Sequence, residues 1–522
     1  MNRTQRASFG IFTLNLFPQT YISGAVIPPQ KHLKTVRHRK NFFISISSFR
    51  LFTHAESLPL KTKEDFESDL ACIMQKFHAE TLLQGGGRLR FHKFYKYVKI
   101  AIAECAVFGY TLLMTTLAAL CAIGAEKVLA NEIKKLGYAV RSNAPGRVLF
   151  DCPEKELFRP NLCLRTADRI YLQAASFAAP DFDALFEGVH AVQWQDFFKK
   201  DVKLHIDKVR IHKSALMSEH GVQSVVHKAV CAKLGSCWRM NVLPESGAQA
   251  DIRVYVENDT ASVFLDLSGA PLNRRGYRKD GGSAPIREST AAVLLQLMCW
   301  KRKIPLHDPF CGSGTIAIEA ALYAYNVAPG FGRRFALENL AVFDAASADE
   351  IRKKEAANIR PDVLARITGT DIDPAAAERA RLNAERAFAG AGRALQLIGS
   401  DLKIPRPDFE CADFKELQAP YGEGCIITNP PYGERLGDED EIPALYKSMG
   451  SLFTDFKGWN MGFITAYADF ERCIGKRASQ AKNLKSGNLD TVFYIYNEQG
   501  YGKQSTQPTE EKDGNRYRPR KA

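Results

Sequence analysis

The chain lacks paired or clustered cysteines. Its 12 cysteines are scattered between Cys72 and Cys473, none forms a Cys-x-x-Cys pair, and the closest two are Cys231 and Cys237. Structural zinc and iron–sulfur sites need clustered thiolates, so we expect no metal site. Free thiols in a chain of 522 residues favour a reducing compartment, and we expect a cytoplasmic protein.

Acidic residues are missing from the first 55 positions, which carry several lysines and arginines. Residues 1–113 have a net charge of +9 and residues 502–522 one of +3, so little of the total of +13 belongs to the middle of the chain. Bulk charge therefore does not show that the folded body binds nucleic acid. We interpret 1–113 as an extension upstream of a start at Met114. A basic arm or an organellar transit peptide is the alternative. Residues 502–522 are typical of a disordered polar tail.

An uninterrupted membrane-spanning run is also missing. The most apolar stretch, Ile100 to Ala125, contains Glu104, Gly109 and Gly124. A bilayer span needs about 20 predominantly apolar residues. We therefore interpret this stretch as a buried strand followed by the start of a helix.

Regular alternation of strands and helices begins at Met114. We expect a strand at Thr115–Ala122, a helix at Glu126–Leu136 ended by Gly137, and a strand–turn–strand unit over Ala139–Phe150. The alternation continues to about Leu272 and predicts one or two small α+β units, followed by a helix at Glu288–Trp300.

From about residue 303 the alternation predicts a doubly wound α/β domain. The expected strands are Ile304–His307, Arg366–Thr370, Leu395–Ile398, Cys425–Thr428, Met461–Ala466 and Thr491–Tyr496. The expected helices are Thr315–Tyr325, one opened by Asp373-Pro374, and Ile442–Phe456.

A glycine-rich turn joins the first of these strands to its helix. It reads Asp308-Pro309-Phe310-Cys311-Gly312-Ser313-Gly314-Thr315. Glycines let the backbone approach a ligand, the helix N-terminus favours a carboxylate, and Asp308 suits a cationic amino group. A dinucleotide site is disfavoured, because its acidic residue belongs about 20 positions on, whereas the next strand-end acid is Asp371. A turn that merely connects strand and helix is the structural alternative.

Acidic residues follow the next two expected strands. Asp371 can accept both hydroxyls of a ribose, Ile372 can pack on an adenine face, and Asp373 caps the following helix. Asp401 follows the expected strand Leu395–Ile398, where it would meet the adenine edge, unless it is a solvated loop acid.

The strongest signal is an apolar strand that ends in Asn429-Pro430-Pro431-Tyr432. Two prolines cannot extend a central strand, and they present bare carbonyls. The side-chain oxygen of Asn429 and the carbonyl of Pro430 can each accept one N–H of an exocyclic base amine. Tyr432 can stack on a base that has left its helix or loop. A proline-rich turn without chemistry is the alternative.

Three of these stretches, Asp308–Thr315, Asp371–Asp373 and Asn429–Tyr432, resemble the signatures of amino-group methyltransferases. Further stretches resemble THUMP-linked RNA methylases: Leu267–Gly269, Arg274–Arg278, Ala284–Glu288, Ala328–Gly330 and Arg334–Glu338. The run Asn429–Leu436, NPPYGERL, is similar to ribosomal large-subunit guanine-N2 methyltransferases.

The resemblance covers roughly 115–497 and implies the domain order. A ferredoxin-like domain (114–167), a THUMP RNA-binding domain (168–272) and a linker helix region (273–302) would precede a Rossmann-like methyltransferase domain (303–501). It implies S-adenosylmethionine as methyl donor and guanine N2 of 23S ribosomal RNA as acceptor. Asp308, Gly312 and Gly314 would hold the methionine end, Asp371 the ribose, Asp401 the adenine, and Asn429, Pro430 and Tyr432 the target base.

Two basic clusters are candidates for RNA phosphate contacts. They comprise Lys199, Lys200, Lys203, Lys208, Arg210 and Lys213 in the first, and Arg274, Arg275 and Arg278 in the second. A solvated face is the alternative for both. Three further functions stay open: N6-adenine methylation, methylation of guanine N2 in tRNA, and a non-catalytic role as an RNA-binding ribosome assembly factor.

Overall fold

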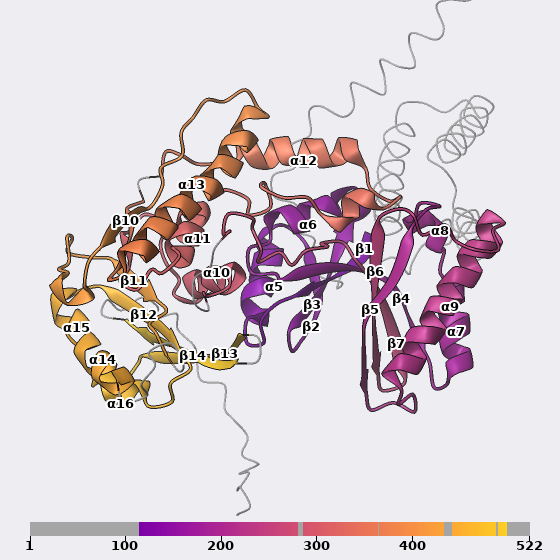
Figure 1. Cartoon of the computed structure of the whole chain (residues 1–522), viewed down its shortest axis with the longest axis horizontal. Helices are drawn as coiled ribbons and strands as arrows, with labels where there is room; N and C mark the ends of the chain where they lie inside the picture. Colours follow the sequence, from indigo (N-terminus) through magenta and orange to yellow (C-terminus); the bar gives the residue numbers. More distant parts are fainter. Residues whose placement is uncertain (1–113, 280–284, 364, 433–440, 487–488, 498–522) are drawn as a thin grey trace, which may run out of the picture. The chain divides into compact units, whose positions relative to one another are not determined.

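The computed structural model of the chain describes residues 114–279, 285–363, 365–432, 441–486 and 489–497. All of them fall within one compact unit of the chain (Figure 1). The predictions for residues 1–113 and 502–522 lie outside the described residues. No helix within the described ranges is long and apolar enough to cross a membrane.

The N-terminal part is built on one seven-stranded sheet in the order β2-β3-β1-β4-β7-β6-β5. Its strands are β1 (Met114–Leu120), β2 (Ala139–Ala144), β3 (Arg147–Pro153), β4 (Arg169–Ala178), β5 (Lys203–His212), β6 (Gln249–Glu257) and β7 (Thr260–Asp266). Its helices are α5 (Glu126–Lys135), α6 (Phe158–Cys163), α7 (Phe182–His190), α8 (Trp194–Phe197) and α9 (Glu219–Trp238). The strand β4 pairs with β1 on one side and with β7 on the other, so the sheet runs without a break across this part.

Alternation along the strands explains which face the helices cover. Ile170 and Ile252 belong to the same buried cluster as Leu129 of α5, Leu185 of α7 and Val226 of α9. The neighbouring strand positions point to the opposite face, because successive side chains of a strand alternate. Figure 1 shows α7 and α9 lying together along the β4–β7 part of the sheet.

The C-terminal part is a second seven-stranded sheet in the order β10-β9-β8-β11-β12-β14-β13. Its strands are β8 (Leu306–Asp308), β9 (Ile367–Asp371), β10 (Asp408–Cys411), β11 (Cys425–Thr428), β12 (Asn460–Thr465), β13 (Gln480–Ser486) and β14 (Leu489–Tyr496). Its α-helices are α10 (Glu288–Leu297), α11 (Thr315–Ala324), α12 (Ala345–Ala357), α13 (Pro374–Gln396), α14 (Glu441–Met449), α15 (Leu452–Asp455) and α16 (Phe470–Ile474). The strands β8 to β12 are parallel, and β14 pairs antiparallel with β12. The predicted Rossmann-like, doubly wound domain is confirmed.

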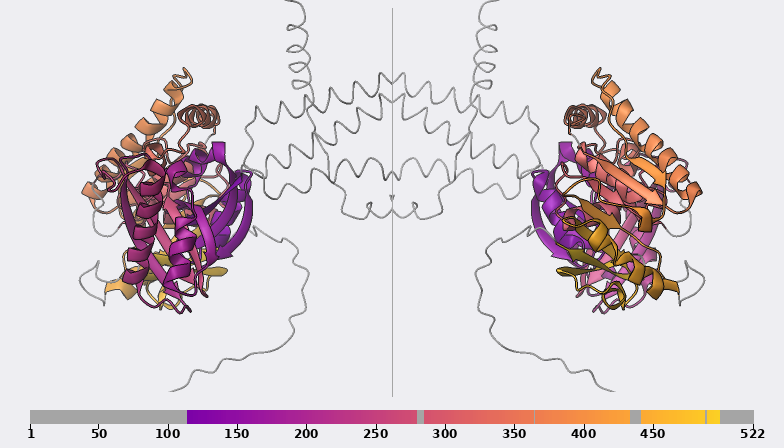
Figure 2. Two further views of the ribbon diagram at one scale, coloured as in Figure 1. Left: turned by 90° about the vertical axis from the view of Figure 1, so that its right-hand side faces the viewer. Right: turned by 90° about the vertical axis from the view of Figure 1, so that its left-hand side faces the viewer.

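Buried side chains cover both faces of this sheet. Ile427 of β11 joins the cluster that includes residues of α10, α11 and α13, whereas its neighbour Ile426 joins the cluster that includes residues of α14, α15 and α16. The long helix α13, orange in the figures, runs along the outside of this part of the chain (Figures 1 and 2). A central strand buried on both faces is a nearly continuous apolar run, and β11 is apolar from Cys425 to Ile427 before the buried, hydrogen-bonded Thr428.

One predicted strand is wrong. Leu395 and Gln396 are the last turn of α13, Leu397 caps that helix, and the third strand of the domain is instead β10. A short apolar run fits the end of a buried helix as well as a strand, and periodicity alone cannot separate them. The predicted helix Ile442–Phe456 is divided into α14 and α15, and the antiparallel strand β13 was not predicted.

Candidate active site

The two strongest sequence signals meet at the carboxyl ends of adjacent strands. The strands β8 and β11 pair in parallel, with Ile426 opposite His307. The hydroxyl of Thr428 donates a hydrogen bond of 2.6 Å to Oδ1 of Asp308, and the N–H of Phe310 donates to the same oxygen at 3.2 Å. Because Thr428 directly precedes Asn429, the glycine turn and the Asn-Pro-Pro-Tyr corner belong to one site.

Asp308 is a buried carboxyl at this junction, with only 1% of its surface exposed. Burial, with a smaller contribution from the nearby charge of Asp371, raises the pKa of Asp308 to about 7 against the hydrogen bonds from Thr428 and Phe310, which lower it. Asp308 therefore titrates near neutral pH, and a cationic group beside it would favour its ionised form.

The glycine turn has the backbone that its sequence predicts. Gly312 and Gly314 both have positive φ angles, 53° and 77°. A Cβ atom on Gly314 would lie 2.9 Å from both Ala380 Cβ and Phe409 Cζ, whereas a Cβ on Gly312 would meet nothing within 4 Å. Gly314 is thus needed for packing, and Gly312 borders open space. The side-chain amide of Asn383, on α13, donates to the carbonyl of Ser313 and fixes the turn from behind at 3.0 Å.

Asp371 lies at the end of β9, beside this turn. One carboxylate oxygen accepts the N–H of Gly312 at 2.8 Å, and the other accepts the N–H of Asp373 at 3.0 Å. Asp373 is the N-cap of α13, where its side chain accepts the N–H of Ala375, and it also pairs with Arg379 at 3.1 Å. The cap lowers the pKa of Asp373, with Arg379 adding to the effect. Ile372, between them in the sequence, is 71% exposed.

The reasoning that selected Asp401 does not hold. Asp401 is exposed in the loop between α13 and β10, so it does not follow a strand. The acid that follows the third strand is Asp413, which is half-buried and accepts the N–H of Lys415 at 3.0 Å. The next ring, Phe414, lies 5.0 Å from the ring of Phe310 in the glycine turn. Sequence reasoning missed Asp413 because it placed the third strand at Leu395–Ile398, where α13 ends, and not at β10.

The Asn-Pro-Pro-Tyr corner is fixed by side chains from two other elements. The hydroxyl of Tyr446, on α14, donates to the carbonyl of Pro431 at 3.0 Å and lies 2.8 Å from Oγ1 of Thr465 on β12. Tyr446 and Thr465 are fully buried. In the sequence, Tyr446 follows Ile442 at helical spacing and reads as an ordinary core residue, so its role was missed.

Asn429 carries an unusual atom. Its side-chain oxygen is buried and, among the described residues, accepts no hydrogen bond. A buried carbonyl oxygen without a donor costs about 1–3 kcal/mol, so its presence needs an explanation. A ligand N–H donor that enters the corner would remove this cost.

The two predicted basic clusters differ in structure. All basic residues of the first cluster are exposed. They lie along or beside the edge strand β5 and comprise Lys199, Lys200, Lys203, Lys208, Arg210 and Lys213. Arg274 of the second cluster is exposed as well. Arg275 is a correction, because it is only 5% exposed and donates to the carbonyls of Leu272 and Arg165, so it cannot reach a phosphate.

Arg278 is also engaged inside the protein. It donates to the carbonyl of Ile286 at 2.9 Å, pairs with the buried Glu288 at 3.1 Å, and reaches Oγ1 of Thr315 at 3.4 Å. These contacts join the start of α10 to the start of the helix behind the glycine turn. We therefore leave Arg278, like Arg275, out of the RNA surface.

Models of known protein families match three successive parts of the chain. A model of the RlmL ferredoxin-like domain matches residues 116–171, a THUMP domain model matches 179–266, and a model described as an RMKL-like methyltransferase domain matches 275–495. Together with the sheet order and the corner at the ends of β8 and β11, these matches define the class. The chain carries a Rossmann-like methyltransferase domain preceded by ferredoxin-like and THUMP domains.

Individual relatives define the family more closely. The Bacillus subtilis (strain 168) protein named "Putative RNA methyltransferase YpsC" is 38% identical over 385 residues, which are 73% of this chain and 95% of that protein. The chain belongs to this family of THUMP-containing RNA methyltransferases.

Two solved structures are similar over the same length. The first, "SMU.472, a putative methyltransferase complexed with SAH", is 33% identical with a TM-score of 0.66, covering 74% of this chain and 99% of that one. The second, from Listeria monocytogenes str. 4b F2365, is described as a predicted N6-adenine-specific DNA methylase. It is 34% identical with a TM-score of 0.67, covering 75% of this chain and 98% of that one.

Proposed function

We propose that the protein transfers a methyl group from S-adenosylmethionine to an exocyclic amine of an RNA base, namely guanine N2 in 23S ribosomal RNA. The observation that carries the proposal is the buried oxygen of Asn429, which has no hydrogen-bond partner among the residues that the structure describes and lies next to Thr428 and its bond to Asp308. An amine N–H supplies the donor that this oxygen lacks.

The residues around the glycine turn fit the donor molecule. Gly312 borders open space at the N-terminal end of α11, which suits the carboxylate of the methionine part. Asp308 suits its ammonium group, Asp371 the ribose hydroxyls, and the exposed Ile372 the adenine face. We assign the adenine edge to Asp413 in place of Asp401. When bound, this donor supplies a methyl group on a sulfonium, which is an excellent leaving group.

The corner orients the acceptor. Asn429 Oδ1 and the carbonyl of Pro430 each accept one N–H of the base amine, so the nitrogen lone pair is directed at the methyl group. Tyr432 stacks on the base. These groups act by positioning, and well-oriented reactants can account for about 7–11 kcal/mol of a barrier. The hydroxyl of Tyr446 keeps the Pro431 carbonyl, and with it the whole turn, in place.

Guanine N2 is favoured over adenine N6 by the run Asn429–Leu436 and by the THUMP domain, which indicates an RNA substrate. N6-adenine methylation stays the alternative, since a relative of similar identity bears that description. Methylation of a tRNA guanine and a non-catalytic role in ribosome assembly also stay open, and the same experiment distinguishes both from the proposed reaction.

The test incubates the full chain and labelled S-adenosylmethionine with ribosomal RNA, with tRNA and with DNA in separate reactions. The modified nucleoside in each reaction is then identified. We expect label in N2-methylguanosine from large-subunit ribosomal RNA. Label only in N6-methyladenine would reject the guanine assignment, and label only in tRNA would reject the ribosomal one. No transfer to any nucleic acid, with the cofactor bound, would favour the role in assembly.

The catalytic assignment is tested by Asn429→Ala. We expect loss of methyl transfer by at least about a hundredfold, with little change in the affinity for S-adenosylhomocysteine, because only the acceptor loses its positioning group. Asn358→Ala, which alters an exposed asparagine at the end of α12, is the control and should keep full activity. Full activity of Asn429→Ala would show that the assigned mechanism is wrong.

A further inference from the structure

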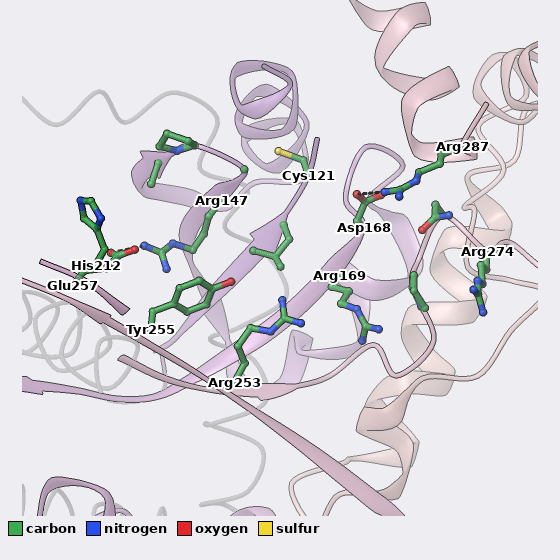
Figure 3. Close-up of a pocket in the computed structure, with 16 residues that line it drawn as sticks. Cys121, Arg147, Asp168, Arg169, His212, Arg253, Tyr255, Glu257, Arg274 and Arg287 are labelled. Carbon is green, nitrogen blue, oxygen red and sulfur yellow. Dashed lines mark hydrogen bonds and ion pairs between the residues drawn. The ribbon is translucent and has the colours of Figure 1, made fainter. Parts of the chain in front are cut away.

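A cleft of about 760 Å³ opens on the first sheet, far in sequence from the glycine turn. Its walls come from β1, β3, β4 and β6, from the segment Pro271–Arg274 and from Arg287, directly before α10 (Figure 3). Arg147, Arg169 and Arg253 occupy alternate strand positions whose neighbours Val148, Ile170 and Ile252 belong to the helix-covered core. The cleft therefore lies on the sheet face opposite α5, α7 and α9.

Arginine dominates the charged lining of the cleft, although carboxylates pair with four of its five arginines. The lining contains two carboxylates, Asp168 and Glu257, and five arginines, namely Arg147, Arg169, Arg253, Arg274 and Arg287. Arginine presents a rigid set of N–H donors that matches phosphate oxygens, and clustered arginines favour an anion.

Carboxylates fix most of these guanidinium groups in place. Arg147 pairs with Glu257 at 3.0 Å, Arg253 with Asp207 at 2.5 Å, and Arg169 with the buried Asp266. Arg287 lies 3.8 Å from Asp168, whereas Arg274 is exposed and has no acidic partner among the described residues. Such a preordered arrangement pays little entropy when a ligand binds.

Flat surfaces accompany the charges. The guanidinium group of Arg147 lies over the ring of Tyr255 at 4.7 Å, and that of Arg253 lies over the ring of Tyr171 at 5.0 Å. Tyr171 is only 2% exposed and outside the cleft lining, so the Arg147–Tyr255 pair is the surface of the two that suits an unpaired RNA base, since such bases stack on aromatic rings and arginine planes. Two buried polar atoms here, Tyr171 Oη and Arg253 Nε, form no hydrogen bond within the described part of the chain.

We propose that this cleft binds a single-stranded segment of the RNA substrate, with phosphates on the guanidinium groups and a base on the Arg147–Tyr255 pair. The inference rests on the proposed RNA methylation. The volume of about 760 Å³ falls within the range of about 300–1,000 Å³ that is typical of sites for small molecules, so the cleft has room for a nucleotide. A duplex needs a broad outer surface, such as the exposed lysines along β5.

The test measures binding of the full chain to a short, fluorescent single-stranded RNA and to a blunt duplex of the same sequence, over a series of salt concentrations. The variant is Arg274→Ala/Arg287→Ala, whose side chains are exposed enough to spare the fold. The control is Arg360→Ala/Arg472→Ala, since these arginines are exposed and lie outside the cleft lining. Arg274→Lys/Arg287→Lys keeps the charge and removes the planar fork.

We expect the alanine variant to bind the single strand roughly tenfold more weakly, with a salt slope smaller by about 1.4, from about 0.7 per neutralised phosphate. The lysine variant should keep the wild-type slope, and the control and the duplex affinity should stay unchanged. Wild-type affinity and slope in the alanine variant would overturn the proposal.

Equal losses for single strand and duplex would also overturn it, because they would indicate a general backbone surface. Methyl transfer by the wild-type chain is measured separately, so that failure of the cleft proposal can be distinguished from failure of the proposed function. If the wild type methylates RNA while the alanine variant binds normally, the cleft proposal fails and the proposed function stands. If the wild type methylates no nucleic acid, the proposed function fails, whatever the variants bind.

Discussion

At the scale of single residues, Asp308 connects the two halves of the site. Its carboxyl is buried, accepts hydrogen bonds from Thr428 and Phe310, and has a pKa raised to about 7. A buried carboxyl that is neutral in acid and charged in base makes both folding and ligand binding depend on pH.

Asp308→Asn should stabilise the unliganded protein above pH 7. The folded state holds the Asp308 proton up to a pKa of about 7, while the unfolded chain releases it near 3.8. Wild-type stability is therefore lost as pH rises from about 4 to 7, and the neutral asparagine avoids that loss, a difference of up to about 4 kcal/mol. Chemical denaturation at several pH values measures it. An advantage that persists undiminished near pH 4 would contradict the assignment.

The same variant should bind S-adenosylhomocysteine more weakly. A charge-assisted hydrogen bond contributes about 1.5–3 kcal/mol, so we expect a loss of roughly tenfold to a hundredfold in titration calorimetry. In the wild type the affinity should fall as the pH drops below about 7, because Asp308 takes up its proton there. A pH-independent affinity in the wild type would show that Asp308 does not hold the ammonium group.

At the scale of secondary-structure elements, α14 acts as a support for the end of β11. Its residue Tyr446 is a positioning residue, since it holds the Pro431 carbonyl and Thr465 of β12 and touches no reacting atom. The two adjacent prolines of the corner have no backbone N–H groups, so a hydrogen-bond donor from another element fixes the position of its carbonyl groups.

Tyr446→Phe should lower kcat by about tenfold and leave the affinity for S-adenosylhomocysteine unchanged. The removed hydrogen bond should also lower the free energy of unfolding by about 1–2 kcal/mol. Tyr496→Phe is the matched control, because that hydroxyl donates to the Lys476 carbonyl at 3.1 Å on another element. A similar fall in kcat for both variants would indicate a general structural effect.

The elements also show what the sequence could reveal. The sequence could predict that Asp308 and Asn429 lie close together. Both stand at the carboxyl ends of parallel strands of one sheet, and such strands end at a common edge. Asp413 was not, because the prediction of a strand at Leu395–Ile398 took the place of β10. The run spans the end of α13 and the residues just after it, and the apolar pattern of so short a run cannot distinguish a helix end from a strand.

At the scale of the whole molecule, a layer of buried charges joins the methyltransferase part to the ferredoxin-like part. Arg165 donates to the Val327 carbonyl at 2.7 Å, Arg275 lies 3.5 Å from Glu319, and Arg159 pairs with Glu355 at 2.7 Å. Arg165 and Arg275 are nine-tenths or more buried. Removing one member of such a layer leaves an uncompensated charge.

Arg275→Ala should therefore lower the free energy of unfolding by about 3–5 kcal/mol. Its neighbour Arg274 is exposed, and Arg274→Ala should change stability by no more than about 0.5 kcal/mol. Urea denaturation of both variants measures the contrast. If the two variants are equally stable, Arg275 does not have the structural role that its burial indicates.

These two adjacent arginines look alike in the sequence, and both were predicted to contact RNA. Only the tertiary structure separates them, because burial depends on residues as distant as Arg165 and Glu319. The cleft was unpredictable for a related reason. Three of its arginines, Arg147, Arg169 and Arg253, lie on separate strands at positions that alternate with core residues, which is also the pattern of ordinary solvent-facing positions.

The strand β4 has a consequence for how this protein can be rearranged. The ferredoxin-like match ends at residue 171 and the THUMP match begins at 179, so the boundary between them falls within β4, which pairs with β1 on one side and β7 on the other. A cut there would strip both fragments of a partner strand and leave open edges that invite aggregation. The ferredoxin-like and THUMP domains therefore form one structural unit. A chimaera with a relative should exchange residues 114–272 as a whole.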